Sequence, residues 1–339
     1  MYATGNKKML NMLILDILRE YSDEEHKLTQ QEIIRLLEKN YDMTCDRRSV
    51  KNNIMFLKEL GYDISMQDGY YLAEREFENA ELRMLIDSVL FSKTISKAQS
   101  KRLVEKLKRF GNRYFIAKVS HVSNLPELQH SDNKQVMLNL DVLNDAIEKK
   151  RKIRFLYNEY GTDFKLHLRR DRPYIVNPYQ LIANNGRYYL IGNYDKYNNV
   201  SHYRIDRMTS VVMLDEPTKP KKQVADFAQG FSLPKHMAEH IYMFSGESVS
   251  VKFKTYTWMM DSLVDWFGKS FRILNEEETK LVISVRCNEQ AMLFWALQYG
   301  KYIEVLEPQN LRDKIRENIE YMYRQYSADI SEVEKDGNR

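Results

Sequence analysis

Apolar residues recur at helical spacing three times in the first sixty residues, which predicts three amphipathic helices. The first has its apolar face between Met9 and Leu18. Thr29 is placed to cap the second helix and Asp46 the third, because both side chains can accept hydrogen bonds from free N-terminal amides. The expected core positions of the third helix are Val50, Ile54, Leu57 and Leu60. Gly61 then ends that helix as a C′ glycine.

Two short strand-like segments follow Gly61. Residues 63–66 and 70–72 flank Asp68-Gly69, a favoured tight turn between antiparallel strands. Three helices followed by a hairpin make a winged helix, which we expect in residues 1–73.

Polar side chains of this segment gather at the starts of the second and third helices. Arginine and asparagine in the first turns of a helix can form bidentate hydrogen bonds to guanine and adenine in the major groove, and a neighbouring helix N-terminus can meet phosphate. The predicted DNA-binding residues are Thr29, Gln30, Gln31, Arg47, Arg48, Ser49, Lys51 and Asn52. The alternative is that these charges only solvate a helix surface. Residues 1–72 carry 10 basic and 12 acidic side chains, so DNA binding requires a local basic patch or a dimer.

The middle of the chain changes from helical to strand periodicity. Residues 74–118 have a helical pattern broken at 92–100, so we expect a helical linker over 74–135 with an exposed connection around 120–133. A helix from residue 140 then leads into short alternating segments. The expected strands cover residues 152–157, 164–168, 174–182, 187–193, 201–207 and 211–214, with a hairpin turn at Asn185-Gly186. Five or six short strands behind one helix predict a small Sm-like or SH3-like β-barrel in residues 136–216.

The last third of the chain has a second mixed pattern. Residues 217–246 show no clear periodicity and are expected to form a connection over the surface. Residues 247–328 alternate strands and helices in the order βαββαβ, which is typical of a ferredoxin-like fold. The predicted fold class is therefore a multidomain α+β protein.

The amino-acid composition argues against several classes of protein. Hydrophobic residues at 43% and charged residues at 29% indicate a globular protein. No stretch approaches the roughly 20 apolar residues of a membrane helix, and no signal peptide is evident, so we expect a cytoplasmic protein without membrane contact. The two cysteines, Cys45 and Cys287, lack CxxC partners and predict neither a disulfide nor a zinc framework. Residues 144–215 carry 13 basic and 8 acidic side chains, which makes the β-rich segment the expected place for an anionic ligand.

The sequence contains no convincing motif for catalysis. Gly268-Lys269-Ser270 resembles the end of a Walker A loop, but Leu263 stands where its first glycine belongs. His236 and His240 have metal-ligand spacing without a third ligand or the glutamate of a zinc protease motif. We therefore expect no catalytic residues, no metal and no cofactor.

The β-rich segment resembles the WYL-domain regulators. The resemblance rests on four segments in order, Phe155-Leu156-Tyr157, residues 176–181, residues 186–190 and residues 203–208, with Tyr188 in the position of the tryptophan that names the family. Members commonly join a winged helix, a WYL domain and a C-terminal WCX extension. The resemblance implies a β domain that binds a regulatory ligand, in some members single-stranded nucleic acid or a nucleotide-like molecule.

The residues of this segment suit such a ligand, because tyrosine rings can stack on bases and arginines can hold phosphate. The predicted ligand-binding residues are Tyr157, Arg169, Tyr179, Tyr188, Tyr189, His202, Tyr203, Arg204 and Arg207. The alternative is that the tyrosines form the barrel core and the arginines pair with Asp171, Asp195 and Asp206.

Together these patterns predict a homodimeric, sequence-specific transcription regulator that binds double-stranded promoter DNA and responds to an anionic ligand. Its two half-sites are expected about one helical turn apart. A second hypothesis is an accessory nucleic-acid-binding subunit of a defence or repair system. A third, an enzyme, lacks a polar catalytic cluster.

Overall fold

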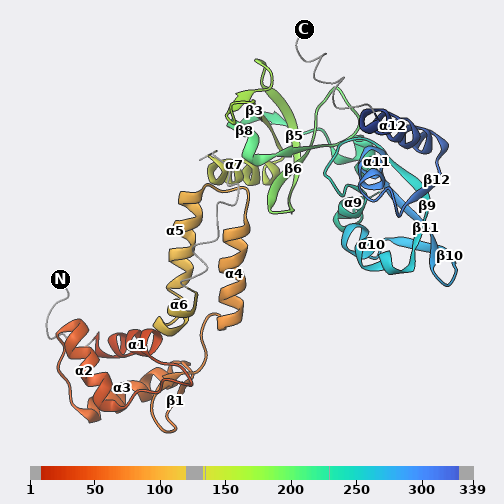
Figure 1. Cartoon of the computed structure of the whole chain (residues 1–339). Helices are drawn as coiled ribbons and strands as arrows, with labels where there is room; N and C mark the ends of the chain where they lie inside the picture. The colour runs from red at the N-terminus through yellow and green to blue at the C-terminus, as the bar shows by residue number, and fades with distance from the viewer. Residues whose placement is uncertain (1–8, 120–132, 134, 229, 328–339) are drawn as a thin grey trace. The chain divides into compact units, whose positions relative to one another are not determined.

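The computed structural model describes residues 9–119, 133, 135–228 and 230–327. The chain divides into two compact units, Met1–Lys134 and Gln135–Arg339 (Figure 1). Each unit has its own hydrophobic core, and each is described by itself.

The first unit begins with three helices and a hairpin, in the predicted order. Its elements are α1 (Leu10–Tyr21), α2 (Gln30–Tyr41), α3 (Arg47–Glu59), β1 (Ile64–Ser65), β2 (Tyr71–Leu72), α4 (Asn79–Phe91), α5 (Lys97–Lys108) and α6 (Arg113–Val119). Thr29 caps α2 in a capping box with Glu32, and Asp46 caps α3 by accepting from the Ser49 amide at 2.7 Å, which confirms both predicted caps. Asp68 and Gly69 have positive φ in the turn between β1 and β2, as the hairpin prediction requires.

One predicted core position in this unit is wrong. Leu60 is 70% exposed, whereas Val50, Ile54 and Leu57 are buried. The reason is that α3 ends at Glu59, and Ile64 of β1 fills the core beyond Leu57.

The predicted linker helices pack within the first unit. Helices α4 and α5 lie side by side (Figure 1), and Ser96 caps α5, so the break between them ends at Ser96 and not at Ser100. Arg75 donates hydrogen bonds to the carbonyl oxygens of Arg19 and Ser22 at the end of α1. The Asn112 amide, before α6, also donates to the Ser22 carbonyl, at 3.2 Å. The linker is thus tied to the end of α1 at two points, just before α4 and just before α6. The predicted connection at 120–133 lies outside the described residues except for Asn133.

The second unit opens with α7 (Val136–Glu148) packed on a curved antiparallel sheet. The sheet contains β3 (Arg151–Tyr160), β4 (Leu166–Leu168), β5 (Tyr174–Asn184), β6 (Arg187–Asn193), β7 (Ser201–Arg204) and β8 (Met208–Pro217). Its order is β4-β3-β5-β6-β7, with β8 on β3. A short 3-10 helix, η3 (Ile205–Arg207), joins β7 to β8, and these two strands do not pair with each other in the part of the chain that the structure describes. The predicted strands are confirmed except at two ends: the strand expected over 164–168 begins at Leu166, because Phe164 has positive φ, and residues 205–207 form η3 and do not continue β7. The predicted Asn185-Gly186 turn is confirmed, since both residues have positive φ.

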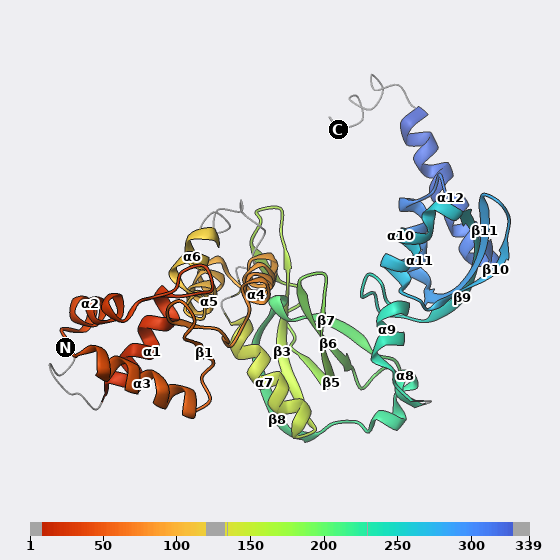
Figure 2. The ribbon, with the colours of Figure 1, turned by 90° about the horizontal axis from the view of Figure 1, so that it is seen from below.

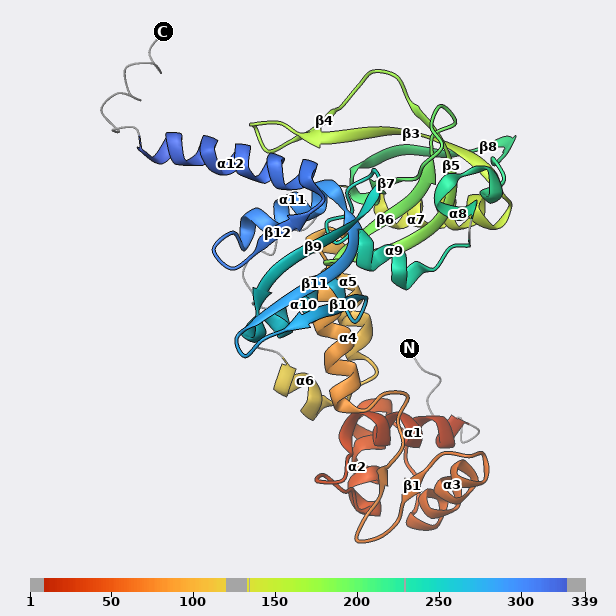
Figure 3. The same cartoon turned by 90° about the vertical axis from the view of Figure 1, so that its right-hand side faces the viewer.

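The connection after β8 contains helices that the sequence did not predict. It forms η4 (Lys221–Gln223), α8 (Ala225–Ala228) and α9 (Leu233–Glu239). These elements are too short to show helical periodicity. Phe227 of α8 packs with Tyr179 and Ile191 in a core cluster, and Figure 3 shows α8 next to the curved sheet. The predicted connection therefore contains three short helical elements and packs on the curved sheet.

The end of the unit has the predicted βαββαβ order. Its elements are β9 (Ser248–Tyr256), η5 (Thr257–Met259), α10 (Met260–Phe267), β10 (Phe271–Glu276), β11 (Lys280–Asn288), α11 (Glu289–Gln298), β12 (Glu304–Glu307) and the closing helix α12 (Gln309–Ser327). The strand order is β10-β11-β9-β12, all antiparallel. Helices α10 and α11 lie on one side of the sheet (Figure 2), where Phe253, Ile283 and Trp295 are fully buried. None of the described helices combines the length and apolarity that a membrane crossing requires.

Candidate nucleic-acid and ligand sites

The α3 polar face consists of Arg47, Arg48, Lys51 and Asn52, and all four side chains are exposed. Arg47 Nη2 donates to Gln31 Oε1 at 2.7 Å, which links the start of α3 to the start of α2. Among the described residues, Arg48, Lys51 and Asn52 make no side-chain hydrogen bond or ion pair with one another or with other residues. Three polar side chains with unused donors therefore extend into solvent from the first half of α3.

The other predicted DNA-binding residues have structural partners. The Thr29 hydroxyl takes part in the capping box of α2. Gln30 Nε2 donates to the Tyr70 hydroxyl at 2.9 Å, next to the hairpin. The Ser49 hydroxyl donates to Asp46 at 3.2 Å. These contacts fix the starts of α2 and α3. The hydrogen-bond donors that remain unused in this set of residues lie on the α3 polar face.

The basic cluster consists of Arg187, Tyr189, Arg204, Asp206 and Arg207. Tyr189 of β6 lies opposite Arg204 of β7, and Arg187 is two residues before Tyr189, so these three side chains share one face of the sheet. The 3-10 turn η3 adds Asp206 and Arg207 directly after β7. The hairpin and the turn thus gather five polar residues from a segment of 21 positions.

A buried carboxylate holds two of these arginines. Asp206 is only 2% exposed. It accepts hydrogen bonds from Arg204 Nη2 at 2.6 Å and Nε at 3.1 Å, and from Arg187 Nη1 at 3.2 Å. Burial acts to lower the pKa of Arg204, but the hydrogen bonds and charge of Asp206 outweigh it, and the pKa is raised. The alternative pairing with Asp206 is therefore correct for Arg204, and Arg187 shares it.

The cluster retains positive charge beyond this pairing. The cluster contains three arginines and one aspartate; Arg187 and Arg204 pair with Asp206, and the Nε atom of Arg207 is buried with no hydrogen-bond partner among the described residues. Burial raises the pKa of Tyr189, and the neighbouring positive charges of Arg204, Arg187 and Arg207 oppose that rise. A half-buried neutral ring beside two excess positive charges is an arrangement that suits an anion carrying an aromatic group.

The remaining predicted tyrosines lie mainly in the core. Tyr157 and Tyr203 are buried with Phe155, at ring-centroid distances of 5.4–6.2 Å. The Tyr157 hydroxyl accepts from the Arg204 amide at 3.1 Å, below the basic cluster. Tyr179 is buried against Phe227, and its hydroxyl donates to the Lys219 carbonyl at 2.8 Å. These rings shape the sheet and do not present a free face.

Two other predicted residues lie outside the cluster. Tyr188 alternates with Arg187 and Tyr189 and so points to the opposite face of β6, where it is 38% exposed. Arg169, after β4, is exposed and lies 3.8 Å from Glu159. The tertiary structure groups Tyr189, Arg204 and Arg207 from the predicted set and adds Arg187. The signal for Arg187 was its period-two spacing from Tyr189.

His202 belongs to a histidine cluster with His236 and His240 of the connection. The Nε2 atoms of His202 and His236 are 2.8 Å apart, and His240 Nδ1 lies 2.9 Å from the Phe244 carbonyl oxygen. A hydrogen bond between two imidazole nitrogens requires one of them to be unprotonated. Burial lowers the pKa of His236 to about 3 and also lowers the pKa values of His202 and His240. The cluster is therefore neutral at pH 7.

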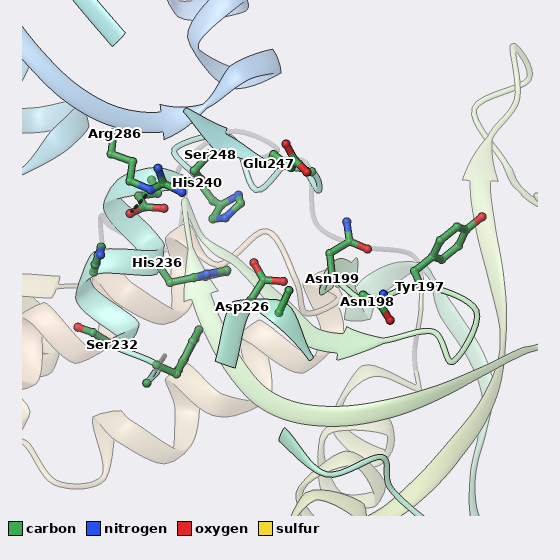
Figure 4. A pocket seen from close by; sticks show the side chains of 16 residues that line it. Tyr197, Asn198, Asn199, Asp226, Ser232, His236, His240, Glu247, Ser248 and Arg286 are labelled. Carbon is green, nitrogen blue, oxygen red and sulfur yellow. Dashed lines mark ion pairs between the residues drawn. The ribbon is translucent and has the colours of Figure 1, made fainter. Parts of the chain in front are cut away.

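A cavity of about 620 Å³ borders the histidine cluster. Its lining includes His236, His240 and Asp226, and Arg286 of β11, which lies 3.4 Å from Glu239 (Figure 4). In the described ranges no group of three or more His, Cys, Asp or Glu side chains is arranged to hold a metal ion. His202 thus packs against His236 and His240 of the connection, on the same face of β7 as Arg204, and its side-chain hydrogen bond and ring contacts are with those histidines.

Comparison with known proteins gives two family matches in the second unit. Residues 139–213 match the WYL domain and residues 248–323 match the WCX domain. The uncharacterized HTH-type transcriptional regulator YobV of Bacillus subtilis (strain 168) is 24% identical over 158 residues, which are 45% of this chain and 47% of that protein. The match thus spans about half the length of this relative.

Two solved structures are similar over most of the chain. The proteasome accessory factor B/C (PafBC) of Arthrobacter aurescens has 14% identity and a TM-score of 0.29, and the match covers 96% of this chain and 50% of PafBC. A CRISPR Cas-related protein has 12% identity and a TM-score of 0.39, with 94% and 85% covered. The two domain matches are the specific result: the second unit carries a WYL domain followed by a WCX domain, which confirms the resemblance to the WYL-domain regulators.

Proposed function

We propose that this protein is a transcription regulator that binds promoter DNA as a homodimer and changes its DNA affinity when an anionic, nucleotide-like or nucleic-acid ligand occupies the WYL domain. In this proposal α1–α3 and the β1–β2 hairpin are a winged helix, the curved sheet is an Sm-like barrel, and the WCX domain is a ferredoxin-like extension. The observation that carries the ligand proposal is the basic cluster, where two positive charges are in excess and the buried Arg207 Nε lacks a partner among the described residues.

The α3 polar face supports the DNA proposal. Arg48, Lys51 and Asn52 are exposed in the first two turns of a capped helix, where a recognition helix contacts base edges. The Arg47–Gln31 hydrogen bond sets the start of α3 against α2. YobV, which is named a helix-turn-helix regulator, is consistent with this assignment.

Replacing Arg47 and Arg48 with alanine is expected to abolish specific duplex binding. Each arginine that contacts a guanine contributes about 1–3 kcal/mol, so the double variant should bind its own upstream duplex at least about tenfold more weakly. The measurement is fluorescence anisotropy across a salt series. A matched control, Lys39→Ala with Lys101→Ala, removes two exposed lysines of the same unit. Equal affinities of the double variant and the parent protein would contradict the winged-helix assignment.

Replacing Arg204 and Arg207 with glutamine is expected to leave duplex binding intact and to end its response to ligand. The probe is a short single-stranded oligonucleotide added to the protein–duplex complex, and the measured quantity is the change in duplex affinity. Circular dichroism checks that the variant is folded. A response that persists in the folded variant would exclude the basic cluster as the ligand site. Binding of the parent protein to single strands alone, without duplex binding, would favour the accessory-subunit hypothesis.

A further inference from the structure

The WCX sheet has one face that its own helices leave uncovered. Burial alternates along β9, where Val251, Phe253 and Thr255 are buried and Lys254 is exposed. The buried positions face α10 and α11, so the even-numbered positions face the other way. Strand β11 follows the same alternation only at its start, where Lys280 is exposed directly opposite Tyr256 and Leu281 is buried; farther along, Ser284 is buried as well. We call this surface, around the end of β9, the open sheet face.

Three aromatic rings meet on the open sheet face. Trp258 is 60% exposed. Its ring lies nearly parallel to that of Tyr256, with ring centroids 6.0 Å apart and an interplanar angle of 20°. Tyr302, before β12, meets Trp258 edge-on at 4.9 Å. A tryptophan this exposed contributes little to the folded core, whereas exposed aromatic clusters are typical of binding surfaces. The rings hold one another in place without covering the tryptophan.

Unpaired lysines surround the rings. Lys254, Lys280 and Lys301 are exposed, and none makes an ion pair with another described residue; Lys301 Nζ lies 5.7 Å from the Tyr302 ring centroid. The acidic residues of β12 already have partners, because Glu304 pairs with Arg312 and Glu307 with Lys252. Positive charge therefore remains available beside the rings.

Acidic residues limit the extent of this surface. The end of β10 carries Glu276, and the turn that follows carries Glu277 and Glu278, close to Lys280 at the start of β11. A phosphate chain would be repelled from that turn, so its favoured path crosses β9 and β12, beside Lys254 and Lys301.

We propose that the open sheet face is a second binding surface, for single-stranded nucleic acid, on which Trp258 and Tyr302 stack with bases and Lys254 and Lys301 contact phosphates. A four-stranded antiparallel sheet with exposed aromatic rings can display unpaired bases on its surface, and duplex bases, already stacked, are not available to it. The surface is separate from the basic cluster, and the proposal goes beyond the proposed function, so the two can fail independently.

The test is binding of the full chain to a labelled oligothymidylate of about 12 nucleotides, a length within the usual site sizes. Trp258→Ala is expected to weaken single-strand binding about 10- to 100-fold. Lys254→Ala with Lys301→Ala should weaken binding and also reduce its salt dependence. Tyr323→Ala with Lys269→Ala is the matched control, since it removes an exposed ring and lysine elsewhere on the WCX domain. Affinities of the two test variants within twofold of the parent protein would overturn the proposal.

Two further measurements distinguish base stacking on the open sheet face from binding at the basic cluster and from a subunit contact. Oligonucleotide should quench the fluorescence of Trp258, and the quenching should disappear in Trp258→Phe even if affinity changes little. Arg204→Gln with Arg207→Gln should retain this quenching, whether or not it retains the ligand response of duplex binding. Loss of quenching in that folded variant would assign single-strand binding to the basic cluster and overturn the proposal. A shift from dimer to monomer in Trp258→Ala, without quenching in the parent protein, would show a subunit contact instead.

Discussion

Replacing Asp206 with alanine is expected to lower the free energy of unfolding of the second unit by about 3–5 kcal/mol, the usual effect of removing one partner from a buried ion pair. The carboxylate is 2% exposed and accepts from both Arg204 and Arg187. Its loss leaves two guanidinium groups close together with no counter-charge. Because Arg204 also donates its amide to the Tyr157 hydroxyl, the disturbance should reach the core.

The measurement is urea unfolding by circular dichroism, with amide hydrogen exchange in β6 and β7 as the local readout. Asp206→Asn, which keeps the shape of the side chain, should have a smaller effect. Asp215→Ala is the control, because that carboxylate is 99% exposed beside Arg151 and its ion pair is expected to contribute at most about 1 kcal/mol. If Asp206→Ala lowers the free energy of unfolding by less than about 1 kcal/mol, the charges of Arg187 and Arg204 are stabilised by solvent and not by Asp206.

Acidification from pH 7 to pH 5 is expected to destabilise the second unit through the histidine cluster. The pKa values of His202, His236 and His240 are all lowered, that of His236 to about 3, chiefly by burial. Below the ordinary histidine pKa of 6.5 the unfolded chain binds protons that the folded cluster does not. Stability is therefore fully present above pH 6.5 and falls as the pH drops toward the folded values.

A buried histidine contributes a loss of about 1.4 kcal/mol per pH unit while the pH lies well below 6.5 and above its folded pKa. His236, whose folded pKa is about 3, meets this condition at pH 5, and His202 and His240 add to the loss in the same direction. The negative charges of Asp226 and Glu239 act to raise the pKa of His240. His240 should therefore contribute less than the other two histidines to the loss of stability. Urea midpoints at several pH values give the slope. His236→Gln should reduce the slope, whatever its effect on stability at pH 7, whereas His167→Gln, an exposed histidine beside Asp163, should not. An unchanged slope in His236→Gln would show that the cluster takes up protons without unfolding.

The site was only partly predictable, because strand alternation shows which residues share a face but not which face is covered. Tyr157 and Tyr203 have the same sequence character as Tyr189, yet they pack in the core under α7 while Tyr189 lies among arginines. Tyr189 lies on the other face of the sheet, where it is partly buried against the core cluster that α8 and α9 cover. Those helices were not predicted, and with them the cavity beside His236 was missed.

Local signals in the sequence determined the elements. Thr29 and Asp46 cap helices because their side chains bond amides three residues away, and Asn185-Gly186 turns a hairpin because both residues tolerate positive φ. Contacts between distant segments needed the tertiary structure: His202 meets His236 across 34 positions, and Trp258 meets Tyr302 across 44 positions. Capping and turns depend on neighbours along the chain, whereas burial and pairing depend on which elements pack together, and this is where the basic cluster and the open sheet face arise.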